Sequence, residues 1–152
     1  MHTYGHKINQ TARIFTKKFN EKLFDLGIFS SQLAIISFLY RNGSSSQVEI
    51  SNYLNVEAPT ITRTLARLEE LGWVVRTEGK NKRERKVSLT PEAQELFPTW
   101  QKAAFEVDAV AIDNISEEDL AVFNRVLKQI FDNLDREPDE SENEGNGPIN
   151  NN

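Results

Sequence analysis

Two short helical patterns joined by a tight turn constrain the fold of this chain more than any other sequence feature. The first pattern starts at Ser46, which has the capping-box spacing to Glu49, and the chain turns after it at Asn55 and Val56. Its expected buried face consists of Ile50, Tyr53 and Leu54. The pattern therefore predicts a short amphipathic helix that ends in a turn.

The second pattern carries Pro59, which a helix accepts only in its first turn, and ends at Gly72, a residue suited to a helix C-terminus. Its expected inner face consists of Ile61, Leu65 and Leu68. Because both helices are short and the turn between them is tight, the two patterns together predict a helix-turn-helix.

The residues after Gly72 change from a helical to an alternating period. Residues 73–77 are rich in β-branched and aromatic side chains, residues 78–83 are charged and turn-like, and residues 85–90 alternate between apolar and polar. This change predicts a β-hairpin with Val87 and Leu89 on its apolar face. A helix-turn-helix followed by a charged hairpin is the winged helix-turn-helix pattern.

Helical patterns precede this central region. An apolar stripe runs from Ile8 to Leu26, and Gly27 is the expected end of that helix. Ser30 and Ser31 are expected to cap a second helix, which is apolar nearly all round. A helix of that kind is expected to be buried.

Two further helices are expected after the hairpin. Thr90 and Pro91 suit the N-cap and first position of one helix, in which Pro98 predicts a kink or a later start. Its expected apolar face consists of Leu96, Trp100, Ala104, Val107 and Ala111. Ser116 and Asp119 have the capping-box spacing at the start of the other helix. Its apolar face consists of Leu120, Phe123, Leu127, Ile130 and Leu134.

Composition excludes several classes of function. The chain has no cysteine, which excludes disulfides and thiolate ligands. Its histidines are His2 and His6, both near the start of the sequence, so a Ser/His/Asp triad has almost nothing to use, and no metal or cofactor is expected. No signal-peptide pattern opens the sequence, and no apolar run approaches the length of a membrane span. We therefore expect a cytoplasmic protein that does not associate with membranes.

The formal net charge of −5 conceals a basic segment. Basic residues gather at the hairpin, where Glu84 is the single acid among Lys80, Lys82, Arg83, Arg85 and Lys86. A two-stranded ribbon with this charge can contact phosphates and so supply affinity for nucleic acid that does not depend on sequence. The alternative, a hairpin that is merely soluble, more often mixes both signs of charge.

The segments PTITRTLARLEELGWVVR and KNKRERKVSLTPEA resemble the recognition helix and wing of the MarR family of bacterial transcription regulators. The resemblance extends over residues 1–136, and its most specific part spans residues 47–90. It implies a mainly α fold with a small β-hairpin wing, in which N- and C-terminal dimerisation helices flank a winged helix-turn-helix. Accordingly, residues 28–90 are expected to bind DNA, and residues 1–27 and 91–136 to form the helical dimerisation region. By composition, residues 137–152 are expected to be a disordered acidic tail.

A recognition helix presents its first turns to base edges in the major groove. The candidates for base contacts are Ala58, Pro59, Thr60, Thr62 and Arg63. Arg63 is the strongest candidate because its guanidinium can donate two hydrogen bonds to guanine. Arg67, one turn later, is expected to contact phosphate, and the alternative for both arginines is a solvated face that pairs with acids such as Glu70.

Contacts to the DNA backbone are expected from two further places. Ser46 and Gln47 stand where the first helix of the pair begins, so they either bind phosphate or only cap the helix. The wing contributes Lys80, Lys82, Arg83 and Arg85. In the family, an arginine two residues after an aspartate at the wing tip enters the minor groove. Arg83 occupies that position here, but Asn81 replaces the aspartate.

The resemblance also implies a homodimer that reads a palindromic operator and a small effector, often aromatic and anionic, that binds near Phe15, Phe19, Trp100 and Arg13. From the residues alone, the apolar stripes of the flanking helices pack either within one chain or against a second copy, and the aromatic effector-site candidates, at helical spacing, are more often core residues. The leading hypothesis is a repressor, and the alternative is a winged-helix module that binds another protein. An enzyme is disfavoured, because Glu117, Glu118 and Asp119 lie in the first turn of a helix, where acids favour the helix dipole.

Overall fold

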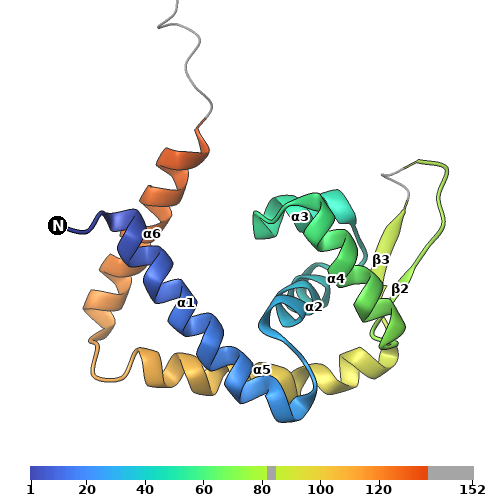
Figure 1. Cartoon of the computed structure of the whole chain (residues 1–152), viewed down its shortest axis with the longest axis horizontal. Helices are drawn as coiled ribbons and strands as arrows, with labels where there is room; N and C mark the ends of the chain where they lie inside the picture. The colour runs from blue at the N-terminus through green and yellow to red at the C-terminus, as the bar shows by residue number, and fades with distance from the viewer. Residues whose placement is uncertain (82–84, 137–152) are drawn as a thin grey trace, which may run out of the picture. The chain divides into compact units, whose positions relative to one another are not determined.

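The computed structural model describes residues 1–81 and 85–136 and is mainly helical (Figure 1). The helices, with η1 a 3-10 turn, are α1 (Tyr4–Leu23), η1 (Phe24–Leu26), α2 (Ser30–Asn42), α3 (Gln47–Leu54), α4 (Ala58–Glu70), α5 (Pro91–Ala111) and α6 (Glu117–Asp135). The strands are β1 (Ser45–Ser46), β2 (Val74–Arg76) and β3 (Lys86–Leu89). The predicted fold class, a helix-turn-helix with a β wing between flanking helices, is confirmed. The expected tail, residues 137–152, lies outside the described residues.

The chain forms two compact units. The first is Met1–Ala111 and contains α1 to α5 with the sheet, and the second starts at Ile112 and contains α6. Within the first unit, α1 packs along α5, and α5 also contacts α2 and β3. The wing and the helix-turn-helix therefore share one body with the two long helices.

Short polar side chains start three helices as the sequence predicts. Ser46 Oγ accepts from the Glu49 amide at 3.1 Å, Thr90 Oγ1 from the Ala93 amide at 3.2 Å, and the Ser116 hydroxyl caps α6 in the same way at 3.1 Å. Each of these bonds satisfies an amide that lacks a partner within its helix. These caps fix where α3, α5 and α6 begin.

The prediction that Ser30 or Ser31 caps α2 is wrong. Phe29 is the N-cap residue, and its amide donates to Gln32 Oε1 at 2.9 Å. The Ser30 amide donates instead to Asn20 Oδ1 on α1 at 2.8 Å. Side chains from the next turn and from a neighbouring helix thus provide the acceptors that a serine hydroxyl was expected to provide.

Residues in the left-handed region end the helices around the helix-turn-helix. Asn55 (φ 53°) ends α3, and Gly72 (φ 76°) follows α4, both as the sequence predicts. A side chain at Gly72 would be strained by this backbone conformation, which favours glycine. Asn55 tolerates it because short polar residues can adopt it. The two turns set the direction of the chain before and after α4.

The sheet has three antiparallel strands in the order β1-β3-β2. In the predicted hairpin, Val74 pairs with Leu89 and Arg76 with Val87. The third strand, β1, was not predicted, because two serines give no alternating pattern to recognise; Ser46 pairs with Lys86. Through β1, the start of α3 is hydrogen-bonded to the wing.

One hydrophobic core joins the helix-turn-helix to α2 and α5. Its most deeply buried members include Leu23, Ile28, Ile35, Ile36, Ile50, Leu65, Leu68, Val74, Phe97 and Trp100. The predicted inner face of α4 is confirmed, since Ile61, Leu65 and Leu68 are buried. The buried helix predicted for residues 30–42 is also largely confirmed.

Two predicted buried faces need correction. Tyr53 is 62% exposed, although its ring lies 4.8 Å from that of Phe38, so α3 buries chiefly Ile50. In α5, Leu96 is exposed and Phe97 is buried. Helix α5 packs against α1, α2 and β3, so it buries residues on more than one stripe.

Pro98 does not delay the start of α5. The helix runs from Pro91 to Ala111 with Pro98 inside it. Thr90 therefore caps the start of α5, as the sequence predicts, and the alternative of a later helix start is wrong.

In the second unit, α6 has a broad apolar face with no buried residue. Its exposed members are Val122, Phe123, Val126, Leu127, Phe131 and Leu134. An apolar face of this extent on a folded chain is typical of a surface that another protein covers.

Within the described ranges, no single helix has both the length and the apolar character needed to cross a membrane. In the same ranges, only the pair of segments Tyr4–Leu26 and Ser30–Asn42 together has that length and composition, and the pair is bent by 81°.

Candidate nucleic-acid interface

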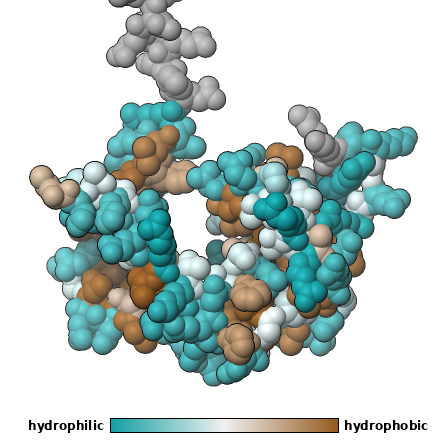
Figure 2. Space-filling model, viewed as in Figure 1, coloured by the Kyte–Doolittle hydropathy of each residue, from teal (hydrophilic) through white to brown (hydrophobic). Residues whose placement is uncertain are grey.

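The outer face of α4 is polar and open to solvent. Because Ile61, Leu65 and Leu68 turn inward, the side chains between them turn outward. The exposed residues of this helix include Ala58, Pro59, Thr60, Thr62, Arg63 and Arg67. All six α4 residues singled out in the sequence thus lie on accessible surface, over which hydrophilic side chains are prominent (Figure 2).

The two arginines of α4 make weak local contacts. Arg63 Nη2 lies 3.4 Å from Thr60 Oγ1, and Arg67 Nη1 lies 3.0 Å from Glu70 Oε2. More than half of the Arg67 and Glu70 side chains is exposed, and an exposed pair of this kind contributes little in water. Neither contact prevents the guanidinium groups from bonding to another partner.

Gln47 connects α3 to α4. Its Nε2 donates to Thr62 Oγ1 and lies 3.5 Å from the Ala58 carbonyl oxygen. Ser46 is 5% exposed, and its hydroxyl both accepts from the Glu49 amide and donates to Glu49 Oε1, at 3.1 and 3.2 Å. The structure therefore gives the Ser46 hydroxyl a capping role and places the Gln47 side chain against α4.

The described part of the wing carries Lys80 and Arg85, both exposed. Arg85 Nε lies 3.5 Å from the Gly79 carbonyl oxygen. Lys82 and Arg83, the other two basic wing candidates, lie outside the described residues. The effect of Asn81, which replaces the aspartate of the family pattern, on the contacts of Arg83 therefore also lies outside the described residues.

A groove of about 1090 Å³ separates the helix-turn-helix from the strands of the wing. Five candidates from the sequence line it: Gln47, Ala58, Pro59, Thr62 and Arg85. Thr60, Arg63, Arg67 and Lys80 are exposed but are not among its lining residues. The groove thus brings together residues from both helices and the wing, which are far apart in the sequence.

Sequence reasoning missed several residues of this groove. They are Val48, Ser51, Asn52, Glu69, Arg76, Thr77, Glu78, Gly79 and Val87, whereas Lys86, which also lines the groove, belongs to the basic cluster recognised in the sequence. The alternating period would not have identified Arg76, because a strand places it on the same face as the buried Val74, yet Arg76 is exposed. The residues from α3 carry no distinguishing sequence signal either.

Two ion pairs join the wing strands to the helices. Lys86 Nζ on β3 lies 3.2 Å from Glu49 Oε1 on α3, and Arg76 Nε on β2 lies 3.3 Å from Glu69 Oε2 on α4. The Lys86 ammonium, followed by the Ser46 hydroxyl, lowers the pKa of the Glu49 carboxyl below 4.5, because both stabilise the charged form.

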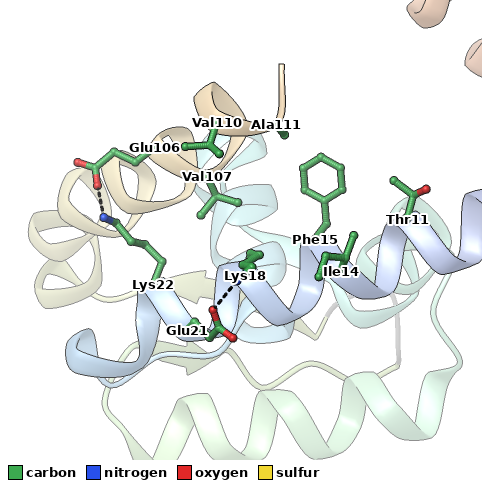
Figure 3. Close-up of a pocket in the computed structure, with 10 residues that line it drawn as sticks. All are labelled: Thr11, Ile14, Phe15, Lys18, Glu21, Lys22, Glu106, Val107, Val110 and Ala111. Atoms are coloured by element: carbon green, nitrogen blue, oxygen red, sulfur yellow. Dashed lines mark hydrogen bonds and ion pairs between the residues drawn. The ribbon is translucent and has the colours of Figure 1, made fainter. Parts of the chain in front are cut away.

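A second pocket, of about 690 Å³, lies between α1 and α5 (Figure 3). Ile14, Phe15, Val107 and Val110 supply much of its apolar lining. Of the residues weighed for an effector site, Phe15 lines this pocket, Trp100 is buried in the core, and Phe19 packs against the core. Arg13 is not among the lining residues.

An ion pair lies at one end of this pocket. Lys22 Nζ on α1 and Glu106 Oε2 on α5 are 2.7 Å apart (Figure 3). The Lys22 ammonium lowers the pKa of the Glu106 carboxyl below 4.5, and Lys102 adds to the effect. Among residues 1–81 and 85–136, no group of three or more His, Cys, Asp or Glu side chains could hold a metal ion.

Comparison with known proteins yields consistent matches. A model described as MarR family matches residues 26–84. The uncharacterized HTH-type transcriptional regulator YwoH of Bacillus subtilis (strain 168) is 42% identical over 126 residues, covering 83% of this chain and 92% of YwoH.

Two solved structures share the fold. Transcriptional regulator PA3341 superposes with a TM-score of 0.77 at 29% identity, covering 87% of this chain and 98% of PA3341. The MepR–DNA complex of S. aureus gives a TM-score of 0.78 at 20% identity, covering 88% of this chain and 99% of MepR.

Proposed function

The chain belongs to the MarR family of transcriptional regulators, which are DNA-binding proteins rather than enzymes, and we propose that it is a repressor that binds a palindromic operator as a homodimer. A repressor of this kind occludes a promoter and acts in the cytoplasm, where the DNA is. The observation that carries the proposal is the exposed face of α4, with Arg63 beside a groove that the wing completes.

The shape of this surface suits a duplex. A helix whose first turns are exposed can enter the major groove, and a basic hairpin on the far side of the groove can follow the phosphates. Arg63 is proposed to read guanine, with Ala58, Pro59, Thr60 and Thr62 on adjacent base edges. The proposed phosphate contacts come from Gln47, Arg67, Lys80, Lys82 and Arg85, the α3 amides beside Ser46, and Arg83 in the minor groove.

The apolar face of α6 supports a dimer. Phe123, Phe131 and Leu134 are each more than half exposed in the single chain, and a second copy would remove them from water. A two-fold dimer would also present two copies of α4 to successive major grooves, which explains why a palindrome is expected. Residues 1–27 and 91–136 are proposed as the dimerisation region, and residues 28–90 as the DNA-binding region.

The pocket between α1 and α5 supports regulation by a small molecule. Its lining is mostly apolar, and each of its two lysines pairs with an acid, Lys18 with Glu21 at 3.2 Å and Lys22 with Glu106 at 2.7 Å, so it suits a small aromatic effector. Because α5 also contacts α2 and β3, a ligand that changes the spacing of α1 and α5 would act on the DNA-binding region. Release from the operator by such an effector is part of the proposal.

Selection from genomic DNA tests the function directly. The purified full-length protein is mixed with fragmented bacterial genomic DNA at a low and a high salt concentration, and the recovered fragments are sequenced. Enrichment of a palindrome that survives the higher salt is the expected result. Binding that is weak, salt-labile and independent of sequence contradicts a specific regulator and would favour a winged-helix module that binds another protein.

A further inference from the structure

An acidic side chain stands beside the groove that the proposed function turns toward DNA. Glu49 lies in the first turn of α3, and its Oε1 is 3.2 Å from the Nζ of Lys86, a residue that lines the groove. A carboxylate near DNA phosphates weakens binding by repulsion. Its position therefore requires an explanation other than contact with DNA.

The hydrogen bonds around Glu49 suggest one. Lys86 is opposite Ser46 in the β1–β3 ladder, and Ser46 is the N-cap of α3. One carboxylate oxygen, Glu49 Oε1, accepts from both the Ser46 hydroxyl and the Lys86 ammonium, each at 3.2 Å. The first turn of α3 and the strand β3 are thus joined by a side-chain bridge in addition to the backbone ladder.

A second bridge holds the other strand. Arg76 on β2 pairs with Glu69 on α4 at 3.3 Å, so each strand of the wing is bonded to one helix of the helix-turn-helix. Both acids form ion pairs between elements. Glu70, by contrast, pairs with Arg67 on its own helix, so this ion pair does not connect two elements.

We propose that Glu49 is a positioning residue for DNA binding: through Lys86 it holds β3, and with it the wing, at the angle where α4 and the wing engage one duplex together. The proposal rests on the proposed function only for the identity of the ligand. The bridge itself is a property of the free protein.

The sign of the effect separates this role from simple electrostatics. If Glu49 acted only as a charge, Glu49→Gln would remove repulsion and tighten binding to every duplex. If Glu49 positions the wing, the same substitution weakens binding to a duplex that requires both α4 and the wing. Lys86→Gln removes the partner, so in that background Glu49→Gln should no longer weaken binding.

The test uses the full chain and a duplex that the wild-type protein selects from a random-sequence library, at one salt concentration. Glu49→Gln, Lys86→Gln, their double variant and the control Glu70→Gln are compared. We expect Glu49→Gln to weaken binding about two- to fivefold, as for the loss of an exposed ion pair, and Glu70→Gln not to weaken it. Equal or tighter binding by Glu49→Gln, or an equal loss in the Lys86→Gln background, overturns the proposal.

Amide hydrogen exchange of the free protein provides a readout that does not need DNA. The Thr77 amide donates to the Lys86 carbonyl oxygen at 2.8 Å, and the Lys86 amide donates to Thr77 Oγ1 at 3.2 Å. Both amides should exchange faster in Glu49→Gln and not in Glu70→Gln. Unchanged exchange overturns the bridge, whereas failure of the wild-type protein to select any duplex contradicts the proposed function instead.

Discussion

The side-chain amide of Gln47, the first residue of α3, donates a hydrogen bond to the hydroxyl of Thr62 on the exposed face of α4. Thr62 Oγ1 in turn lies 2.9 Å from the Ala58 carbonyl oxygen, its partner one turn back. This bond fixes the first helix of the pair against the helix that carries the proposed base contacts. It also orients a hydroxyl on the surface that would face the bases.

Replacing Gln47 tests the importance of that bond. Gln47→Ala should lower affinity for the selected operator by about 1 kcal/mol, the typical net value of a hydrogen bond, and lower affinity for unrelated duplexes less. Binding titrations on both duplexes measure the difference. Gln129→Ala is the control, since Gln129 makes a comparable bond to Asn133 at 2.9 Å on α6. An equal loss on all duplexes would assign Gln47 to phosphate alone.

Arg63→Ala should weaken binding to the operator by about 1–3 kcal/mol and relax base preference at one position in each half-site. The reason is the loss of two donors that can bond guanine. A panel of single-base operator variants measures the preference, with Arg41→Ala at the end of α2 as the control. Retained preference at every position would contradict base reading by Arg63.

Arg85→Ala should weaken binding to all duplexes to a similar extent and reduce the slope of log affinity against log salt by about one unit. Arg85 is exposed on the wing and lines the groove, so the expected contact is to phosphate. Titrations over a range of salt concentrations measure the slope. An unchanged slope removes Arg85 from the interface.

Phe123→Glu should weaken or abolish the dimer, because it places a charge on the apolar face of α6. Sedimentation over a range of protein concentrations measures the association. Val75→Glu, at an equally open site on β2 that is 50% exposed, should leave the dimer intact. Equal dimerisation of both variants would show that α6 is not in the interface.

The Lys22–Glu106 ion pair should make a stabilising contribution that depends on pH. Because Lys22 lowers the pKa of Glu106 in the folded chain below 4.5, the contribution is fully present above that value and is lost as the pH falls through the lowered pKa. Urea unfolding of wild type and Glu106→Gln should therefore differ at neutral pH and converge as the pH falls through the lowered pKa of Glu106. Glu95→Gln, an exposed acid on the same helix, serves as the control, and a difference that persists in acid would contradict the pairing.

Local signals made much of the fold predictable. Ser46, Asn55 and Gly72 mark the ends of α3 and α4 by their chemistry alone, and the resulting inner face of α4 leaves its outer residues exposed by elimination. The proposed base-reading residues follow from that face. The alternating period after Gly72 likewise identifies the hairpin.

Features that depend on distant partners were not predictable. Leu96 and Phe97 are neighbours with similar hydrophobicity, and only the arrangement of α1, α2 and β3 around α5 decides which is buried. The partners Glu49 and Lys86 are 37 residues apart, and no spacing rule links them. The groove between the helices and the wing, which these contacts shape, could therefore be found only in three dimensions.

Thr90 connects three elements at a single residue. Its hydroxyl donates to the Gly72 carbonyl oxygen at 2.7 Å and accepts from the Ala93 amide at 3.2 Å, while its own amide donates to the Trp73 carbonyl oxygen at 3.1 Å. The end of α4, the start of β2 and the first turn of α5 thus meet at one fixed joint. Because α4 and α5 are joined at this residue, a tilt of α5 in the regulated protein would carry α4 with it.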